Sequence, residues 1–174
     1  MQMNKYKKKL LKKAGCELKN DLATINWASI CEYKTLSEEF IREFDCYLNW
    51  AYISSFQKLS EDFIREFQDK VKWYRISADQ QLSESFIREF QDRVSWLSVS
   101  TDQHLSDTFL LEFQHKILWK WYFGSRKSTF SIMKQFICKT DYKSVLDDFK
   151  ISHLSEPQQQ EIERLLTFKH VFAK

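Results

Sequence analysis

Glycine and proline are nearly missing from this chain of 174 residues, which has two glycines, Gly15 and Gly124, and one proline, Pro157. These residue types supply the backbone conformations of most β-turns. A β-sandwich or a β-barrel needs many such turns, so their scarcity argues against both folds. Helices joined by short polar corners are expected instead.

Apolar runs are short as well, with none longer than four residues, whereas a membrane-spanning helix needs about 20. The first residues carry lysines but no apolar segment of the kind that a secretory signal requires. The sequence therefore predicts a soluble, cytoplasmic protein without a membrane span.

Metal-binding and disulfide patterns are not present. The cysteines show no CxxC and no paired spacing, and the histidines are scattered, so no metal site and no cofactor are expected. Cys31 stands where later units have serine, which suggests a reduced thiol in a small-residue position. The residues concerned are Cys16, Cys31, Cys46, Cys138, His104, His115, His153 and His170.

Catalytic motifs are also missing, because no P-loop, GxSxG, HExxH or dinucleotide fingerprint occurs. Ser131 and Lys134 form an isolated S-x-x-K without its companion motifs, which is a weak signal for a nucleophile. The sequence predicts that the chain is not an enzyme.

What the chain does have is an internal period of 23 residues. Leu-Ser pairs and two phenylalanine positions recur in the same register as the tryptophans. A period between 20 and 50 residues is typical of stacked-repeat proteins. The tryptophans in register are Trp27, Trp50, Trp73, Trp96 and Trp119.

One repeat, residues 59–81, predicts two helices. Ser60 followed by two acidic residues is a helix N-cap pattern. Apolar residues at i, i+1, i+4 and i+8 then indicate a first helix over 60–71, and Trp73 opens a shorter second helix. We therefore expect an all-α solenoid of helix-turn-helix units, with Trp packed on Trp and Phe on Phe between neighbouring units.

A leucine-rich-repeat-like α/β solenoid is the alternative fold, with the V-x-W segment at Val71 and Trp73 as a short strand. A period of 23 permits it. Against it, Trp73 and Ile76 are three residues apart, which would send them to opposite faces of a strand.

Charge divides the chain into three parts of one continuous domain. Residues 1–19, a basic arm or helical cap, carry a net charge of +6, and the repeats over 20–123 carry −6. Residues 124–174, a divergent repeat and a capping helix, carry +3. A repeat protein that tracks nucleic acid along its length is expected to place basic residues on the repeats, which this chain does not do.

The segment LSEDFIREFQDKVKWYRIS, residues 59–77, resembles a short tandem repeat of giant DNA viruses and large phages. The resemblance covers residues 22–123 most closely. It implies a viral or phage source, the host cell cytoplasm as location, and an interaction scaffold without shared catalytic residues. A host protein is then the expected partner.

Positions that vary between repeats are candidates for binding a protein partner. The two residues after each tryptophan change from unit to unit, and several are of types enriched at interface hot spots: Tyr52, Tyr74, Arg75 and Trp121. Ordinary surface variation explains the same pattern. The repeated Arg-Glu pairs of the F-I-R-E-F segment are expected to form ion pairs between units rather than a binding site.

The basic arm offers a second surface, for nucleic acid, together with the basic C-terminal segment. The lysines concerned are Lys7, Lys8, Lys9, Lys12 and Lys13. A solvated helix face is the alternative interpretation. Self-association through an uncapped end of the array is a third way in which the chain could find a partner.

Overall fold

The structure is a computed structural model that describes residues 5–15, 22–124, 129–136 and 154–172, with the side chains of Thr24 and 166–172 left aside. Twelve α-helices and one 3-10 helix lie in these ranges, and no strand does. The chain divides into two compact units, Met1–Leu82 and Ser83–Lys174, each of which is described by itself.

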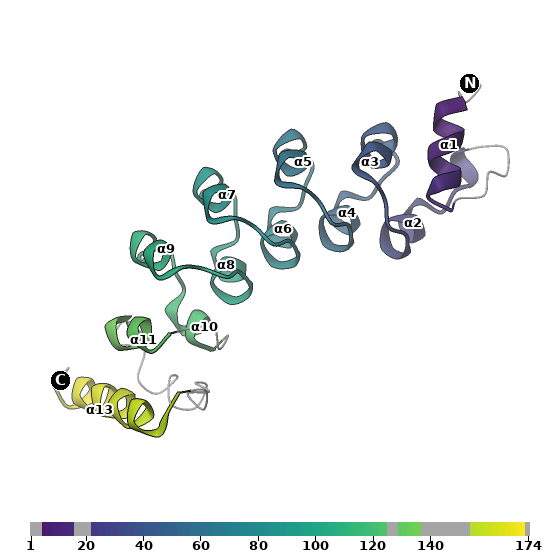
Figure 1. Cartoon of the computed structure of the whole chain (residues 1–174). Coiled ribbons are helices and arrows are strands. Elements are labelled where there is room, and N and C mark those ends of the chain that lie inside the picture. The colour runs from purple at the N-terminus through teal and green to yellow at the C-terminus, as the bar shows by residue number, and fades with distance from the viewer. Residues whose placement is uncertain (1–4, 16–21, 125–128, 137–153, 173–174) are drawn as a thin grey trace. The chain divides into compact units, whose positions relative to one another are not determined.

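The Met1–Leu82 unit contains two layers of helices (Figure 1). The first-layer helices α3 and α5 lie along one side with α1, and the second-layer helices α2, α4 and α6 pack side by side along the other. The elements are α1 (Lys5–Lys13), η1 (Leu22–Thr24), α2 (Trp27–Tyr33), α3 (Glu38–Phe44), α4 (Trp50–Phe56), α5 (Glu61–Glu66) and α6 (Trp73–Asp79).

The Ser83–Lys174 unit repeats the same plan and ends in a longer helix. Its α8 and α10 pack together, and α11 packs against α13. The elements are α7 (Glu84–Glu89), α8 (Trp96–Asp102), α9 (Asp107–Glu112), α10 (Trp119–Gly124), α11 (Phe130–Phe136) and α13 (Glu156–Phe172).

The expected all-α repeat fold is confirmed, and the α/β alternative is not supported. Val71 lies in the corner before α6, and Trp73 is the first residue of that helix rather than part of a strand. The serine caps are also as expected: Ser60 Oγ accepts a hydrogen bond from the Phe63 amide at 3.2 Å. Ser37, Ser83 and Ser106 cap α3, α7 and α9 in the same way.

The predicted first helix over 60–71 was too long, because α5 ends at Glu66. The amides of Lys70 and Val71 both donate to the Phe67 carbonyl, which closes a tight turn after the helix. Val71 still reaches the core, at 5% exposure. Val71 reaches the core from the corner before α6. Its position eight residues after Phe63 matches the spacing of a longer helix, which explains the wrong prediction.

The core is built on phenylalanines, whereas most of the tryptophans are only half-buried. Phe63, Phe86 and Phe109 are fully buried. The expected Trp-on-Trp packing was wrong: the Trp50 ring lies 5.0 Å from that of Phe67 in the next repeat, and Trp96 lies 5.3 Å from Phe113. Trp50 and Trp96 therefore each join the second helix of their own repeat to the residue that caps the first helix of the following repeat.

Two buried glutamines, Gln57 and Gln80, each link their repeat to the one before it. Gln57 Nε2 donates to the carbonyls of Cys31 and Lys34, both at 2.8 Å, and its Oε1 accepts from the Leu36 amide at 2.8 Å. Gln80 makes the equivalent three bonds: it donates to the Ser54 and Gln57 carbonyls of the preceding repeat and accepts from the Leu59 amide at the start of its own repeat. The glutamine satisfies backbone groups that the sharp corner leaves without helical partners.

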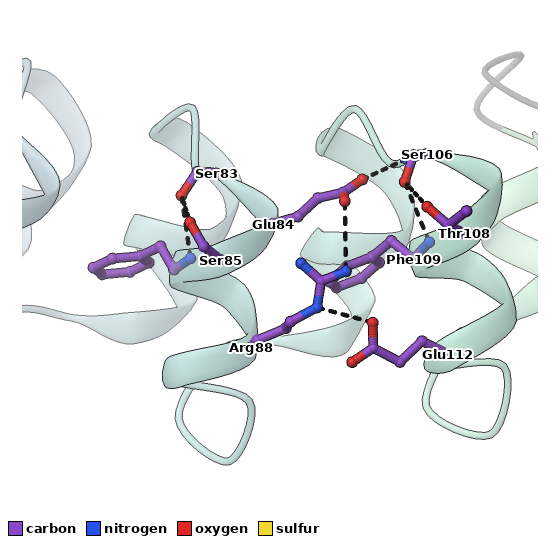
Figure 2. Close-up of polar contacts among 9 residues, drawn as sticks. Ser83, Glu84, Ser85, Arg88, Ser106, Thr108, Phe109 and Glu112 are labelled. Carbon is purple, nitrogen blue, oxygen red and sulfur yellow. Dashed lines mark hydrogen bonds and ion pairs between the residues drawn. The ribbon is translucent and has the colours of Figure 1, made fainter.

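Charged side chains join the first-layer helices at the surface. Figure 2 shows Arg88 of α7, 2.8 Å from Glu112 of α9, and Glu84, which accepts a hydrogen bond from the Ser106 amide at 2.6 Å. Arg42 and Glu66 form the same 2.8 Å pair in the other unit. The predicted ion pairs between neighbouring repeats are confirmed for Arg42 and Arg88, so these two arginines already have acidic partners.

Helices at both ends pack onto the neighbouring repeat. Leu10 and Leu11 of α1 are buried, and Ile162 of α13 is buried in a cluster with Met133 and Phe136. Among the residues that the structure describes, no helix has the length and apolar character needed to cross a membrane. Residues 16–21, 125–128 and 137–153, which complete the predicted end segments, lie outside the described ranges.

The cysteines differ in their surroundings. Cys31 is buried in the position that Ser54 occupies in the next repeat, as its register predicted. Burial raises the pKa of its thiol above the ordinary value, which keeps it protonated. Cys46 is exposed, and Cys16 and Cys138 lie outside the described residues.

Candidate partner-binding surfaces

The second-layer helices bury one side and turn the other to solvent. In α4, Ile53 and Ser54 are fully buried, whereas Tyr52 is half-buried and Phe56 is exposed. We call the outward positions, one, two and six residues after each tryptophan, the outer second-helix surface. These positions vary between repeats while the buried ones recur, so the surface changes in chemistry along a constant scaffold.

Three aromatic residues gather on this surface in the Met1–Leu82 unit, and we call Tyr33, Tyr52 and Phe56 the aromatic cluster. Tyr33 is 74% exposed and Phe56 is 56% exposed. The rings of Tyr52 and Phe56 stack with centroids 5.8 Å apart. A hydrogen bond to Glu32 raises the pKa of Tyr33, and the nearby Tyr52 adds to the shift. Tyr33 and Tyr52 lie on α2 and α4, which pack side by side.

Tyr74 and Arg75 of α6 lie on the outer second-helix surface as predicted, and Tyr74 is 55% exposed. The Arg75 guanidinium lies 5.1 Å from the centroid of the Tyr74 ring and 4.0 Å from the Asp79 carboxylate. The pair presents an aromatic ring beside a cation, a combination enriched at interface hot spots.

Trp121 lies on α10 in the Ser83–Lys174 unit, with 53% of its surface exposed. The Lys120 ammonium is 5.9 Å from its ring. It is the tryptophan outside the 23-residue register, and it differs from Trp119, which is buried against Phe136 with ring centroids 4.3 Å apart. The structure therefore separates a packing tryptophan from an exposed one within a single helix.

Two exposed aromatics, Tyr33 and Phe56, were missed by the sequence argument. The predicted binding positions were the two residues after each tryptophan, whereas Tyr33 and Phe56 stand six residues after one. The signal was available, because the same position holds Asp79 and Asp102 in later repeats. One further helical turn brings this position next to the one two residues after tryptophan.

The predicted basic arm forms helix α1, and one of its lysines is engaged. Lys7 Nζ lies 2.8 Å from Glu43, which makes it an anchor of the helix rather than a free contact for an anion. Lys8, Lys9, Lys12 and Lys13 are exposed, and Lys5 joins them. None of these five makes an ion pair within the described ranges.

Metal-ligating residue types and the S-x-x-K motif both occur in the part of the chain that the structure describes. No group of three or more histidine, cysteine or acidic side chains there is placed to hold a metal ion. Ser131 is exposed, and Lys134 forms an ion pair with Glu161 at 2.6 Å. The S-x-x-K lysine is therefore engaged in fastening α13 to α11.

Comparison with protein-family models, with curated proteins and with solved structures gave no match to this chain. The described residues offer two candidate binding surfaces: the outer second-helix surface and the lysines of α1.

Proposed function

We propose that the chain is a non-catalytic repeat scaffold that binds a protein partner through the outer second-helix surface. The observation that carries the proposal is the aromatic cluster, in which Tyr33 and Phe56 are exposed and Tyr52 is half-buried, on a protein whose repeated phenylalanines and tryptophans are buried or half-buried. Contiguous exposed apolar surface costs solubility and commonly marks an interaction site.

The distribution of constant and variable positions supports a scaffold. The caps, the glutamine links and the phenylalanine core recur from repeat to repeat, so they hold the outer surface in a fixed geometry. Side chains held on short packed helices lose little further freedom on binding. Rigid aromatics are therefore well suited to serve as anchors.

The chemistry of the aromatic cluster indicates the kind of partner. The cluster offers two phenol rings and one phenyl ring, none of them positively charged, and the Tyr33 hydroxyl is hydrogen-bonded to Glu32. A matching protein surface would present an apolar depression with hydrogen-bond acceptors at its rim. In its finer form the proposal makes the chain a viral or phage factor acting on a host protein, which rests on the sequence resemblance alone.

The test is affinity capture from a lysate of the cell in which the protein functions, read by quantitative mass spectrometry. Wild type is compared with Tyr33→Ala/Tyr52→Ala/Phe56→Ala. The exposed Leu111→Ala on α9 serves as control, since it removes apolar surface from the other helical layer. We expect wild type and the control to capture the same partner protein. The amount of that protein captured by the triple variant should be lower by at least about tenfold.

A captured set that is the same for all three proteins would refute the proposed surface. Light scattering of each purified protein shows whether the triple variant changes self-association. A dimer that dissociates in the triple variant alone would identify a second copy of the chain as the partner, contrary to the proposal of a different protein.

A further inference from the structure

We propose that the solvent face of α1 binds the phosphate backbone of nucleic acid without reading its sequence. The face consists of Lys5, Lys8, Lys9, Lys12 and Lys13, and we call it the lysine face. It lies on a different helix from the aromatic cluster, so this inference stands or falls independently of the proposed protein partner.

The lysine face is a compact array of charge. At 3.6 residues per turn, its five members fall within an arc of about 140° and along about 12 Å of helix. All five are exposed and have no acidic partner among the described residues. The Lys34 ammonium lies against Gly15, 3.5 Å from where a Cβ would stand, and adds a sixth positive charge beyond the end of the helix.

The opposite side of α1 fixes this array in place. Leu10 and Leu11 are 5% and 0% exposed. The Tyr6 hydroxyl donates to Glu39 of α3 at 2.6 Å, and Lys7 pairs with Glu43. A polyanion would therefore meet a preformed row of ammonium groups instead of a disordered tail.

The arrangement is unfavourable for the free helix, which argues against a purely structural role. Other first-layer helices begin with acidic residues after a serine cap, where the helix dipole favours negative charge. Helix α1 has no acidic residue in its first turn. Five pairs of its lysines are also spaced at i+3 or i+4, where like charges repel. A bound anion relieves both penalties.

Nucleic acid fits this face better than a membrane or an acidic protein does. An interfacial helix needs an exposed apolar side, but the apolar residues of α1 are buried against the repeats. Protein interfaces are depleted in lysine and use aromatic or apolar anchors at their centre. The lysine face has no such anchor, whereas duplex DNA presents about one charge per 1.7 Å of its axis.

The residue types on the face also predict the lack of sequence preference. Arginine, asparagine and glutamine, which read base edges with paired hydrogen bonds, are not among its members. Lysines on flexible stems act as point charges toward phosphate. Contacts of this kind position a protein on nucleic acid but do not specify a sequence.

Fluorescence anisotropy with a labelled 24-base-pair DNA of mixed sequence tests the inference on the full chain between 0.05 and 0.2 M salt. We expect binding that weakens steeply with salt and that is equal within about twofold for a shuffled duplex. Lys9→Gln/Lys12→Gln should lower the slope of log affinity against log salt by about 2 and weaken binding about 30-fold at 0.15 M.

The matched control is Lys58→Gln/Lys72→Gln, which removes two exposed lysines from the repeats and causes the same change in net charge. We expect it to bind within about twofold of wild type. Lys8→Gln/Lys13→Gln provides an independent second pair on the lysine face, and circular dichroism verifies that every variant is folded.

Three results would overturn the inference. The first is the absence of duplex binding at 0.05 M salt. The second is an equal loss in the control and in the lysine-face variants, which would indicate a general effect of net charge. The third is sedimentation with phosphatidylserine vesicles without binding to DNA, which would make an anionic membrane the partner.

Discussion

At the scale of single residues, the buried glutamines determine how one repeat joins the next. Gln57 is 3% exposed, donates hydrogen bonds to two carbonyls of the preceding repeat and accepts one from the Leu36 amide at the start of its own repeat. A periodic sequence shows that the position recurs, but the partners lie 21 to 26 residues away and follow from the fold alone.

Replacing Gln57 with alanine should lower the free energy of unfolding by about 3 kcal/mol, because buried backbone groups then lose their partners. Urea unfolding measures the change. Gln81→Ala is the control, since that side chain is exposed, and it should shift the free energy by less than about 0.5 kcal/mol. Equal effects of the two substitutions would show that the links between repeats do not depend on glutamine.

The buried Tyr122 should make the free energy of unfolding depend on pH in the alkaline range. Burial, followed by the nearby charge of Asp107, raises the pKa of its hydroxyl to about 12 from 10.0. Its neutral form is favoured in the folded state, so the stabilisation is complete below pH 10 and is lost as the pH rises toward 12. The stability of wild type relative to Tyr122→Phe should fall by roughly 2 kcal/mol across this window. A constant difference in urea unfolding would contradict this.

At the scale of helices, α1 departs from the pattern of the other first-layer helices. Those helices place a serine cap and acidic residues at their start, and α1 places lysines there. It keeps its position because Leu10 and Leu11 are buried and because Tyr6 and Lys7 contact α3. Tertiary packing therefore outweighs an unfavourable local charge pattern in this helix.

Substituting Lys5 with glutamate should increase the free energy of unfolding by about 0.5–1 kcal/mol, since it adds a favourable charge at the helix start and a pair with Lys9. Thermal unfolding at low salt measures the gain, and Lys5→Gln should show a smaller one. A loss of stability on charge reversal would mean that Lys5 has a structural role in α1.

The helices show what could be predicted from the sequence. Serine caps and recurring apolar positions predicted where α3, α5, α7 and α9 begin, because these signals are local. The end of the first helix could not be predicted, since Val71 reaches the core from a corner with the spacing of a helix.

The candidate surface was predicted in part. Tyr52, Tyr74, Arg75 and Trp121 all lie on the outer second-helix surface, since variation between repeats points to positions outside the core. The stacking of Tyr52 on Phe56 and the proximity of Tyr33 depend on how α2 and α4 pack. Periodicity does not supply that packing.

At the scale of the whole molecule, the repeat itself is the unit of stability. Each repeat buries its apolar side against the adjacent repeats. The free energy of unfolding is therefore close to a sum of the contributions of single repeats and of the contacts between adjacent repeats. The caps, the glutamine links and the Trp–Phe contacts all keep the 23-residue register.

Deleting residues 59–81, one full period, should therefore leave a folded chain, in which Gln103 takes the register position of Gln80. Deleting 20 residues, 59–78, shifts every later cap and core position out of register and should abolish cooperative unfolding. Circular dichroism during thermal unfolding distinguishes the two. Similar behaviour of both deletions would contradict a fold built on a strict register.

The central claim is that the constant positions of the repeat build a scaffold and the variable outer second-helix surface binds a protein. Photo-cross-linking tests it most directly, with p-benzoylphenylalanine placed at Tyr52 and, as control, at Leu111. We predict a light-dependent adduct with one protein from position 52, which excess wild type suppresses and the Tyr33→Ala/Phe56→Ala variant does not. An adduct of equal yield from position 111, or no adduct from position 52, would contradict the claim.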